Sequence, residues 1–321
     1  MLYEHGDKMK RAIVFGGSGF IGKALVGNLV KQKYCVNVYT RNYDKAMVLK
    51  LFGNLGQVDI TVGSLSNAVF IKKLVSECDV VINLVGAIHT PRHDVMRFLH
   101  TTFPGNIATL AQKYQKKFVH FSAMGADIAL SSFYAQSKLD GERLVRELCP
   151  SSIIIRPNLV FGEEDSFFGR FARVAQIMPF LPVFGGGKNL VQPVYVRDVV
   201  DLAASLITGP WEGGVHEICG PQAYSLRELM KFILQVTERN RPVVSIPFFM
   251  AKIMAFFCEF KLVSFVTQPL TGDYNPLVTR DQIELMKYDL VPTSDTQVTV
   301  GRVAIERVVP EALAVYRKVV R

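Results

Sequence analysis

The chain has 321 residues, of which 49% are hydrophobic, so it is long enough to bury a sizeable core and predicts one large domain with a smaller appendage. Its formal net charge of +9 favours an acidic partner, but Lys and Arg are spread along the chain in blocks no longer than a pair, so we expect no nucleic-acid partner. The five cysteines form no C-x-x-C pair, which argues against a zinc ribbon or a disulfide framework and indicates a reducing compartment.

The first eleven residues contain neither the apolar run of a signal peptide nor an Arg- and Ser-rich transit stretch. We therefore expect the protein to stay where it is made. A bacterial cytoplasm is favoured, and a processed chain in the mitochondrial matrix is the alternative.

The first half alternates apolar runs of strand length with segments of helical period, which is typical of repeated βαβ units. The predicted strands are 11–15, 35–40, 58–62, 79–85, 117–122 and 152–156. The predicted helices are 20–33, 67–77, 106–115 and 133–148. This order predicts an α/β fold with a doubly wound parallel sheet of the Rossmann type, which covers residues 10–158.

The second half is less regular and predicts a smaller C-terminal lobe made of residues 159–189 and 221–321. We expect residues 190–220 to return to the first sheet through two strands, 192–196 and 215–219. The apolar stretch 243–266 contains Pro247, Lys252, Glu259 and Lys261, so it cannot span a bilayer. A core helix is favoured for it, with a docking surface for a membrane or a hydrophobic partner as the alternative. The apolar residues concerned are Phe248, Phe249, Met250, Ile253, Met254, Phe256 and Phe257.

A glycine-rich loop follows the first predicted strand and opens a helix, the context in which it binds a dinucleotide. Gly16, Gly19 and Gly22 permit a tight turn, close approach of the backbone to a diphosphate, and close packing of the helix on the sheet. The free N–H groups at the start of the helix would face the phosphates. The expected phosphate contacts are Gly16, Gly17, Ser18, Gly19, Phe20, Ile21 and Gly22.

The end of the second predicted strand indicates which dinucleotide is bound. Sites that prefer NAD place Asp or Glu about there, whereas this chain has Arg41, with Lys45 nearby. A guanidinium is suited to a 2′-phosphate. Asp44 lies beyond the strand, where a helix cap explains it equally well. We therefore predict NADP(H) in preference to NAD(H).

Later strand ends complete the predicted pocket, because ligands collect at the carboxyl ends of parallel strands. Ser64 and Leu65 are expected near the adenine, and Val85, Gly86 and Ala87 near the nicotinamide ribose. Pro157 and Asn158, which follow the sixth strand, are further candidate contacts.

A possible catalytic set lies between the fifth strand and the following helix. Tyr134 and Lys138 are four residues apart and therefore project from one helix face. A nearby lysine is expected to lower the pKa of the phenol, and it can also hold the cofactor ribose without any turnover. Ser122 is placed to hold a substrate oxygen. His89 and His93 are also four apart, but they lack a third ligand, so we predict no metal site.

These features together resemble the extended and atypical short-chain dehydrogenase/reductases, and four segments narrow the resemblance to the NADH dehydrogenase alpha-subcomplex subunit nine family. The segments are 121–126, 156–158 with 161–165, 192–199, and 277–282. The resemblance implies a bound NADPH, little or no turnover, and a place among the subunits of respiratory complex I at the membrane surface, which for a bacterial member is the inner face of the inner membrane. Ser64 departs from the Asp usual in extended members.

Two classes of function therefore compete. The chain is either an accessory or assembly subunit of complex I that holds its cofactor structurally, or a reductase, epimerase or dehydratase that acts with NADP(H) on a nucleotide sugar or lipid. The apolar stretch favours the first, and the intact Ser122, Tyr134 and Lys138 favour the second. A third interpretation is a redox-sensing regulator that binds NADP(H) without chemistry.

Overall fold

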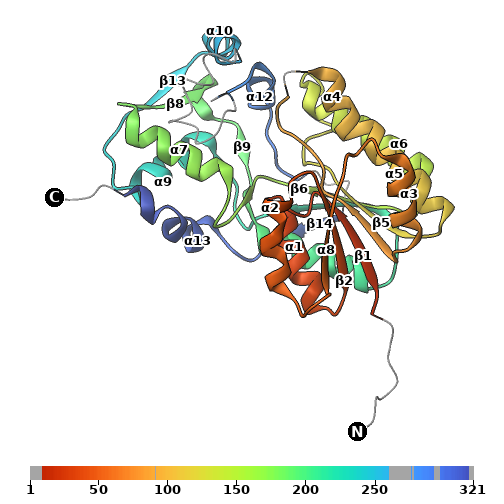
Figure 1. The fold of residues 1–321 in the computed structure, drawn as a ribbon. Helices are drawn as coiled ribbons and strands as arrows, with labels where there is room; N and C mark the ends of the chain where they lie inside the picture. Colours follow the sequence, from red (N-terminus) through yellow and green to blue (C-terminus); the bar gives the residue numbers. More distant parts are fainter. Residues whose placement is uncertain (1–8, 91, 260–275, 277, 293–296, 318–321) are drawn as a thin grey trace.

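The computed structural model describes residues 9–90, 92–259, 276, 278–292 and 297–317 (Figure 1). In the first half the strands are β1 (Arg11–Phe15), β2 (Cys35–Thr40), β3 (Val58–Val62), β4 (Val80–Asn83), β5 (Lys117–Phe121) and β6 (Ile153–Pro157). The helices are α1 (Phe20–Lys31), α2 (Tyr43–Met47), α3 (Ala68–Ser76), α4 (His93–Arg97), α5 (Phe103–Lys113) and α6 (Phe133–Leu148), with a 3-10 turn η1 (Val48–Phe52) and a π turn η2 (Phe98–Thr102).

The second half contains shorter strands and the helices of the lobe. The strands are β7 (Val160–Phe161), β8 (Leu181–Phe184), β9 (Leu190–Val191), β10 (Val194–Tyr195), β11 (Gly214–Cys219), β12 (Tyr224–Ser225), β13 (Val243–Ile246) and β14 (Gln297–Val300). The helices are α7 (Ser166–Ile177), α8 (Val196–Thr208), α9 (Leu226–Val236), α10 (Phe248–Cys258), α12 (Arg280–Leu285) and α13 (Ile305–Ala312), with 3-10 turns η3 (Gly185–Gly187) and η4 (Ala314–Tyr316).

Eight of the described strands form one parallel sheet in the order β14-β11-β6-β5-β4-β1-β2-β3. The order runs outward in both directions from the β1–β4 pair, which is the doubly wound arrangement expected from the sequence. The order of the strands reverses next to β1, and in open parallel sheets ligands bind at the carboxyl ends of the strands at such a point. The glycine loop lies there.

The two faces of the sheet carry separate apolar cores. In β1, Ala12 and Val14 pack toward α1 and α8, whereas Ile13 and Phe15 pack toward α3 and α5. This alternation follows from the pleat of a strand, in which successive side chains point to opposite faces. Because both faces are covered by helices (Figure 1), the central strands read in sequence as continuous apolar runs.

The expectation that residues 192–196 return to the first sheet is wrong. β10 pairs with β7 in a separate two-stranded ladder, and Pro193 before it has no N–H to donate to a longer one. The strand expected at 215–219 does join the main sheet, as β11 beside β6. The chain then returns once more, because β14 pairs with β11 although its sequence lies within the stretch predicted to form the lobe.

The lobe packs around two further clusters. The larger one joins α7, α9, α13 and β8, and the smaller one lies between α10, α12 and Phe184. The described part of the apolar stretch forms β13 and α10, while residues 260–266 lie outside the described residues. The prediction of a core helix here holds for one face only: α10 packs Ala251 and Ala255 into the smaller cluster and buries Cys258, while several of its larger apolar side chains are exposed. The exposed ones are Phe249 (70%), Met250 (53%), Ile253 (48%), Phe256 (45%) and Phe257 (57%).

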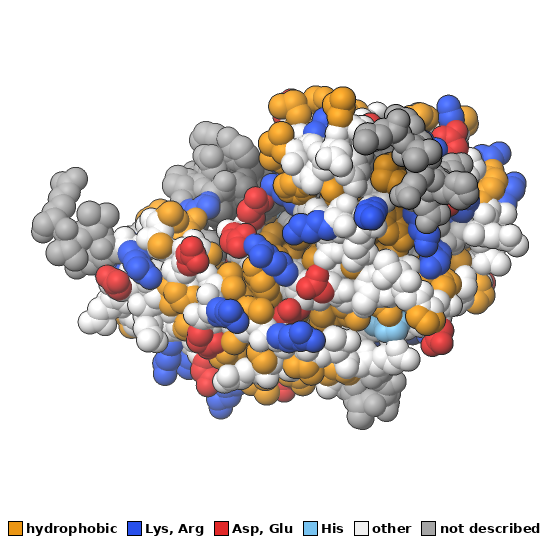
Figure 2. Space-filling view, turned by 90° about the horizontal axis from the view of Figure 1, so that it is seen from below, with side chains coloured by type: hydrophobic (Ala, Val, Ile, Leu, Met, Phe, Trp, Pro, Cys, Tyr) orange, Lys and Arg blue, Asp and Glu red, His pale blue; other side chains and the backbone are white. Residues whose placement is uncertain are grey.

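Among the described helices, none has the length and apolar character needed to cross a membrane. Figure 2 shows one face of the molecule, on which basic and acidic side chains are interspersed among apolar ones. The excess of positive charge is therefore not gathered into a single patch on this face.

Candidate functional site

Two glycines of the glycine loop stand where a side chain would be strained or would clash with the backbone. Gly16 has a φ of +81°, a conformation that L side chains rarely adopt. A Cβ on Gly22 would lie 2.4 Å from the carbonyl oxygen of Gly16 and 2.6 Å from the Cα of Gly17. The N–H of Gly19 donates to the Gly16 carbonyl at 3.0 Å, which closes the turn.

Helix α1 starts directly from this loop, with Gly19 as its N-cap, and no side chain among the described residues caps it. Its first-turn N–H groups are therefore available to an anion, and the helix dipole favours negative charge at this position. Phe20 and Ile21 contribute these backbone groups, while their side chains pack into the apolar clusters. The loop thus has the properties of a diphosphate cradle.

The end of β2 lies beside this cradle. The hydroxyls of Ser18 and Thr40 are 3.1 Å apart, so the loop and the strand end are hydrogen-bonded to each other. Arg41 follows Thr40 directly and is exposed. Asn42, and not Asp44, caps the short helix α2, through a hydrogen bond from the N–H of Lys45.

The end of β3 is fixed to the end of β2 by a side chain. The hydroxyl of Tyr39 donates to the carbonyl of Ser64 at 2.8 Å. Leu65 packs against the apolar cluster below, whereas Ser64 is exposed. The two predicted adenine contacts therefore lie at the expected edge of the sheet, next to β2.

The loop after β4 is fixed by hydrogen bonds from its backbone. The N–H of Val85 donates to Asn83 Oδ1 at 3.1 Å, and the N–H of Ala87 donates to His100 Nε2 at 3.1 Å. A Cβ on Gly86 would lie 3.2 Å from Lys138 Nζ. The structure therefore brings the predicted ribose loop into contact distance of helix α6, which carries the predicted catalytic residues Tyr134 and Lys138.

Lys138 is buried at this position, and its ammonium donates to the carbonyl of Phe121 at 3.1 Å. Burial lowers the pKa of Lys138 to about 8, although the charge of Glu142 acts in the opposite direction. Ser122 follows Phe121 and is also buried, and its hydroxyl has no hydrogen-bond partner among the described residues. A buried unpartnered hydroxyl at a strand end is suited to a ligand oxygen.

The expected lowering of the Tyr134 pKa is wrong. Burial and the negative charge of Asp281 raise the pKa of Tyr134 to about 12. Asp281 belongs to the C-terminal lobe, so it could not be placed here from the sequence. The phenol is therefore protonated at neutral pH in this arrangement.

His100 is a site residue that sequence reasoning missed. It lies in the π turn η2 and is fully buried. Its ring packs edge-on against the ring of Tyr134, with the two ring centroids 5.3 Å apart. Because Nε2 accepts from Ala87, Nδ1 must carry the proton and donate to the hydroxyl of Ser137 at 2.8 Å, which donates in turn to the Tyr134 carbonyl. Burial lowers the pKa of His100 to about 2, so this neutral form persists at ordinary pH. No sequence motif marks His100; the structure singles it out through the π turn, because π turns occur often at functional sites.

Asn158 lies directly after β6, and its side chain is bonded within the protein. Its side-chain N–H groups donate to Met124 Sδ and the Leu290 carbonyl, and its Oδ1 accepts from the N–H groups of Leu159 and Gln192. The hydrogen-bonding capacity of the amide is therefore used within the protein. Pro157, the last residue of β6, is also buried.

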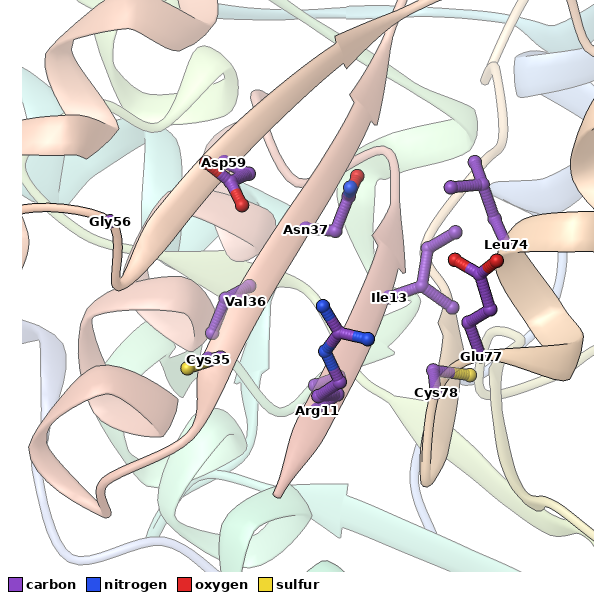
Figure 3. Close-up of a pocket in the computed structure, with 11 residues that line it drawn as sticks. Arg11, Ile13, Cys35, Val36, Asn37, Gly56, Asp59, Leu74, Glu77 and Cys78 are labelled. Atoms are coloured by element: carbon purple, nitrogen blue, oxygen red, sulfur yellow. The ribbon is translucent and has the colours of Figure 1, made fainter. Parts of the chain in front are cut away.

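A separate hollow lies at the opposite end of the sheet, between the amino ends of β1, β2 and β3 (Figure 3). It is lined by Arg11, Asn37, Asp59 and Glu77, and its volume is about 120 Å³. Ligand pockets for small molecules usually occupy about 300–1,000 Å³. This hollow is therefore too small for a dinucleotide. In the part of the chain that the structure describes, no group of three or more His, Cys, Asp or Glu could hold a metal ion.

The fold and the cradle together define a dinucleotide-binding protein of the Rossmann type. Residues 12–219 match the NAD dependent epimerase/dehydratase family. The chain is 32% identical over 286 residues to "NADH dehydrogenase [ubiquinone] 1 alpha subcomplex subunit 9, mitochondrial" of Mus musculus, which covers 88% of this chain and 73% of that protein. The chain therefore belongs to the NAD dependent epimerase/dehydratase family, and within it to the family of alpha subcomplex subunit 9 proteins.

A second relative and one solved structure are also similar to this chain. The protein of the same name from Dictyostelium discoideum is 28% identical over 299 residues, which covers 90% of this chain and 80% of that protein. Among solved structures, DesIV, a dTDP-glucose 4,6-dehydratase from Streptomyces venezuelae with NAD and TYD bound, superposes with a TM-score of 0.69 at 16% identity and covers 95% of this chain and 96% of that one. The likeness to DesIV concerns the fold alone.

The residues present fit a nicotinamide dinucleotide. Gly16 and Gly22 leave the space, the start of α1 offers N–H donors, and Lys138 and Ser122 offer a buried ammonium and a free hydroxyl. When bound, such a cofactor supplies hydride transfer. These residues would bind it and orient it.

Proposed function

We propose that this chain binds NADP(H) at the cradle and serves as an accessory subunit of a respiratory NADH:ubiquinone oxidoreductase, with the cofactor held for structure. The observation that carries the proposal is the complete cradle in a chain whose relatives are named as subunits of that complex. The exposed apolar side chains of α10 support a docked state, because a patch of this kind marks an interaction surface on many proteins. The location proposed is the inner face of a bacterial inner membrane, or the matrix side in a mitochondrion.

A second candidate is a reductase, epimerase or dehydratase that acts on a nucleotide sugar or lipid. The intact set of Ser122, Tyr134 and Lys138 favours it. The raised pKa of Tyr134 weighs against it, because a general base works best when its pKa lies near the operating pH. We therefore place the accessory subunit first.

One experiment distinguishes the accessory subunit from the enzyme. The tagged full chain is extracted from its native cells with a mild detergent, and the proteins and nucleotide that it retains are identified by mass spectrometry. Complex I subunits together with NADPH support the proposal, and Tyr134→Phe should then leave the assembly intact. A lone protein with exchangeable NADP(H) would overturn the proposal and favour the enzyme.

The choice of NADP(H) over NAD(H) is tested at Arg41. Arg41→Ala should weaken NADPH binding by about ten-fold or more, since a hydrogen bond to a charged group contributes about 1.5–3 kcal/mol. NADH, which lacks the 2′-phosphate, should bind within about two-fold of its original affinity. Calorimetric titration of both nucleotides measures this, with Lys31→Ala at the far end of α1 as the control. Unchanged affinity for both nucleotides would show that Arg41 does not hold the 2′-phosphate.

A further inference from the structure

The segment 277–282 stands out in the sequence, and the cofactor site described above leaves Asp281 of α12 without a role. Its carboxylate reaches across from the C-terminal lobe to the start of helix α6. It accepts from the hydroxyl of Ser132 at 2.9 Å, from the N–H of Phe133 at 2.6 Å and from the N–H of Tyr134 at 3.0 Å.

The carboxylate of Asp281 provides part of the cap at the start of helix α6. The first N–H groups of a helix have no partner within the helix, and negative charge is favoured there by the helix dipole. Ser132 caps α6 by accepting from the N–H of Ala135, and the Asp281 carboxylate accepts from the two residues between them. The first turn of α6, which carries Tyr134, is therefore held from outside its own domain.

Helix α12 is fixed in turn to the helix that carries the exposed apolar side chains. Thr279 and Gln282 form a capping box at its start. Arg280 bonds to Glu259 at the end of α10 through both its backbone N–H (2.8 Å) and its guanidinium (2.9 Å). Ile283 is buried against Ala251 and Ala255 of α10. Helices α10 and α12 thus form one unit, which we call the α10–α12 unit.

Ser131, just before the start of α6, contacts Glu284 of α12 and Tyr288, which follows α12. Ser131 lies 3.1 Å from the hydroxyl of Tyr288 and 3.4 Å from Glu284. The ring of Tyr134 also contacts His100, which accepts a hydrogen bond from Ala87 in the loop after β4. Tyr134 therefore contacts both His100, which is hydrogen-bonded to the proposed cofactor loop, and Asp281 of the α10–α12 unit.

We infer that Asp281 is a positioning residue that couples binding of NADPH beside Tyr134 and Lys138 to the seating of the α10–α12 unit on the first domain. The inference rests on the proposed cofactor binding. Because a coupling free energy acts equally in both directions, bound NADPH holds the unit in place, and a seated unit tightens NADPH. Through this coupling, a cofactor that is held for structure keeps the apolar surface of α10 in a fixed orientation.

The test compares hydrogen–deuterium exchange of α12 in the full chain with and without NADPH. In the wild-type protein, NADPH should slow exchange in the peptide that contains residues 278–290. Asp281→Asn keeps the shape of the side chain, but it removes the charge and one acceptor oxygen. This variant should lose most of the protection, and its NADPH affinity should fall by about ten-fold, a typical coupling between sites.

Two further variants separate coupling from a general loss of structure. Asp281→Glu retains the carboxylate and should recover both NADPH affinity and protection in part. Glu311→Gln removes an exposed acid from α13 of the same lobe and should change neither quantity. A structural tether alone would lower the melting temperature of Asp281→Asn without changing the protection that NADPH gives to α12.

The outcomes distinguish the two proposals. Failure of the wild-type protein to bind NADPH would overturn the proposed function itself. If the wild-type protein binds NADPH while Asp281→Asn keeps full affinity and full protection, the cofactor proposal stands and the coupling through Asp281 is wrong.

Discussion

Replacing Gly22 by alanine is expected to lower the affinity for NADPH by at least about 100-fold, which corresponds to about 2.7 kcal/mol. The added Cβ would lie 2.4 Å from the Gly16 carbonyl oxygen and 2.6 Å from the Gly17 Cα. Both are backbone atoms, so the clash cannot be relieved by turning a side chain. The loop must move away from the start of α1, and the N–H groups that face the phosphates lose their alignment. Isothermal titration with NADPH measures the effect.

Gly27→Ala is the matched control, because Gly27 lies in the same helix. Its Cβ would lie 3.5 Å from Phe52 Cδ2, which is ordinary van der Waals contact. In a helix, alanine is favoured over glycine by about 1 kcal/mol, so this variant should fold at least as well as the original chain and bind NADPH equally. If Gly22→Ala bound NADPH as tightly as Gly27→Ala, the phosphates would not lie against this loop.

The parts of the fold that the sequence predicted are those with local causes. The bounds of β1, β2, β3 and α6 agree with the expected ones, because apolar runs, turn residues and helical period are all signals within a few residues. The cradle could be predicted for the same reason. Gly16, Gly19 and Gly22 lie within seven residues, and the surrounding backbone requires glycine at Gly16 and Gly22.

What could not be predicted depends on contacts between distant segments. β14 joins the main sheet beside β11, about eighty residues earlier in the chain, and nothing in its four residues indicates that neighbour. Burial raises the pKa of Tyr134, and the charge of Asp281, which lies 147 positions away along the chain, raises it further. The prediction that Lys138 lowers this pKa considered only the helix that carries both residues, so it omitted burial and the opposing charge from the lobe.

The second large effect is expected at Arg156, where the sequence showed a family segment and the structure shows a buried charge network. The guanidinium donates to both oxygens of Glu142 at 2.7–3.1 Å, to Asp127 at 2.6 Å and to Glu217 at 3.3 Å. Arg156→Met should lower the free energy of unfolding by about 3–5 kcal/mol, because Glu142 and Glu217 are left charged and buried without their cation. Denaturant unfolding followed by circular dichroism measures this.

Arg197→Met provides the comparison, since Arg197 forms an exposed pair with Glu163 at 3.4 Å and should contribute less than about 1 kcal/mol. Replacing Glu142 and Glu217 by leucine together with Arg156→Met should recover much of the loss, because an apolar cluster carries no desolvation cost for charge. Equal stability of Arg156→Met and Arg197→Met would contradict the prediction.

The network also bears on the cofactor site, because Glu142 lies one turn from Lys138 on α6 and its charge opposes the effect of burial on the pKa of that lysine. Arg156 bonds to Glu142 from β6, so the same guanidinium fixes the carboxylate whose charge acts on the ammonium beside Gly86.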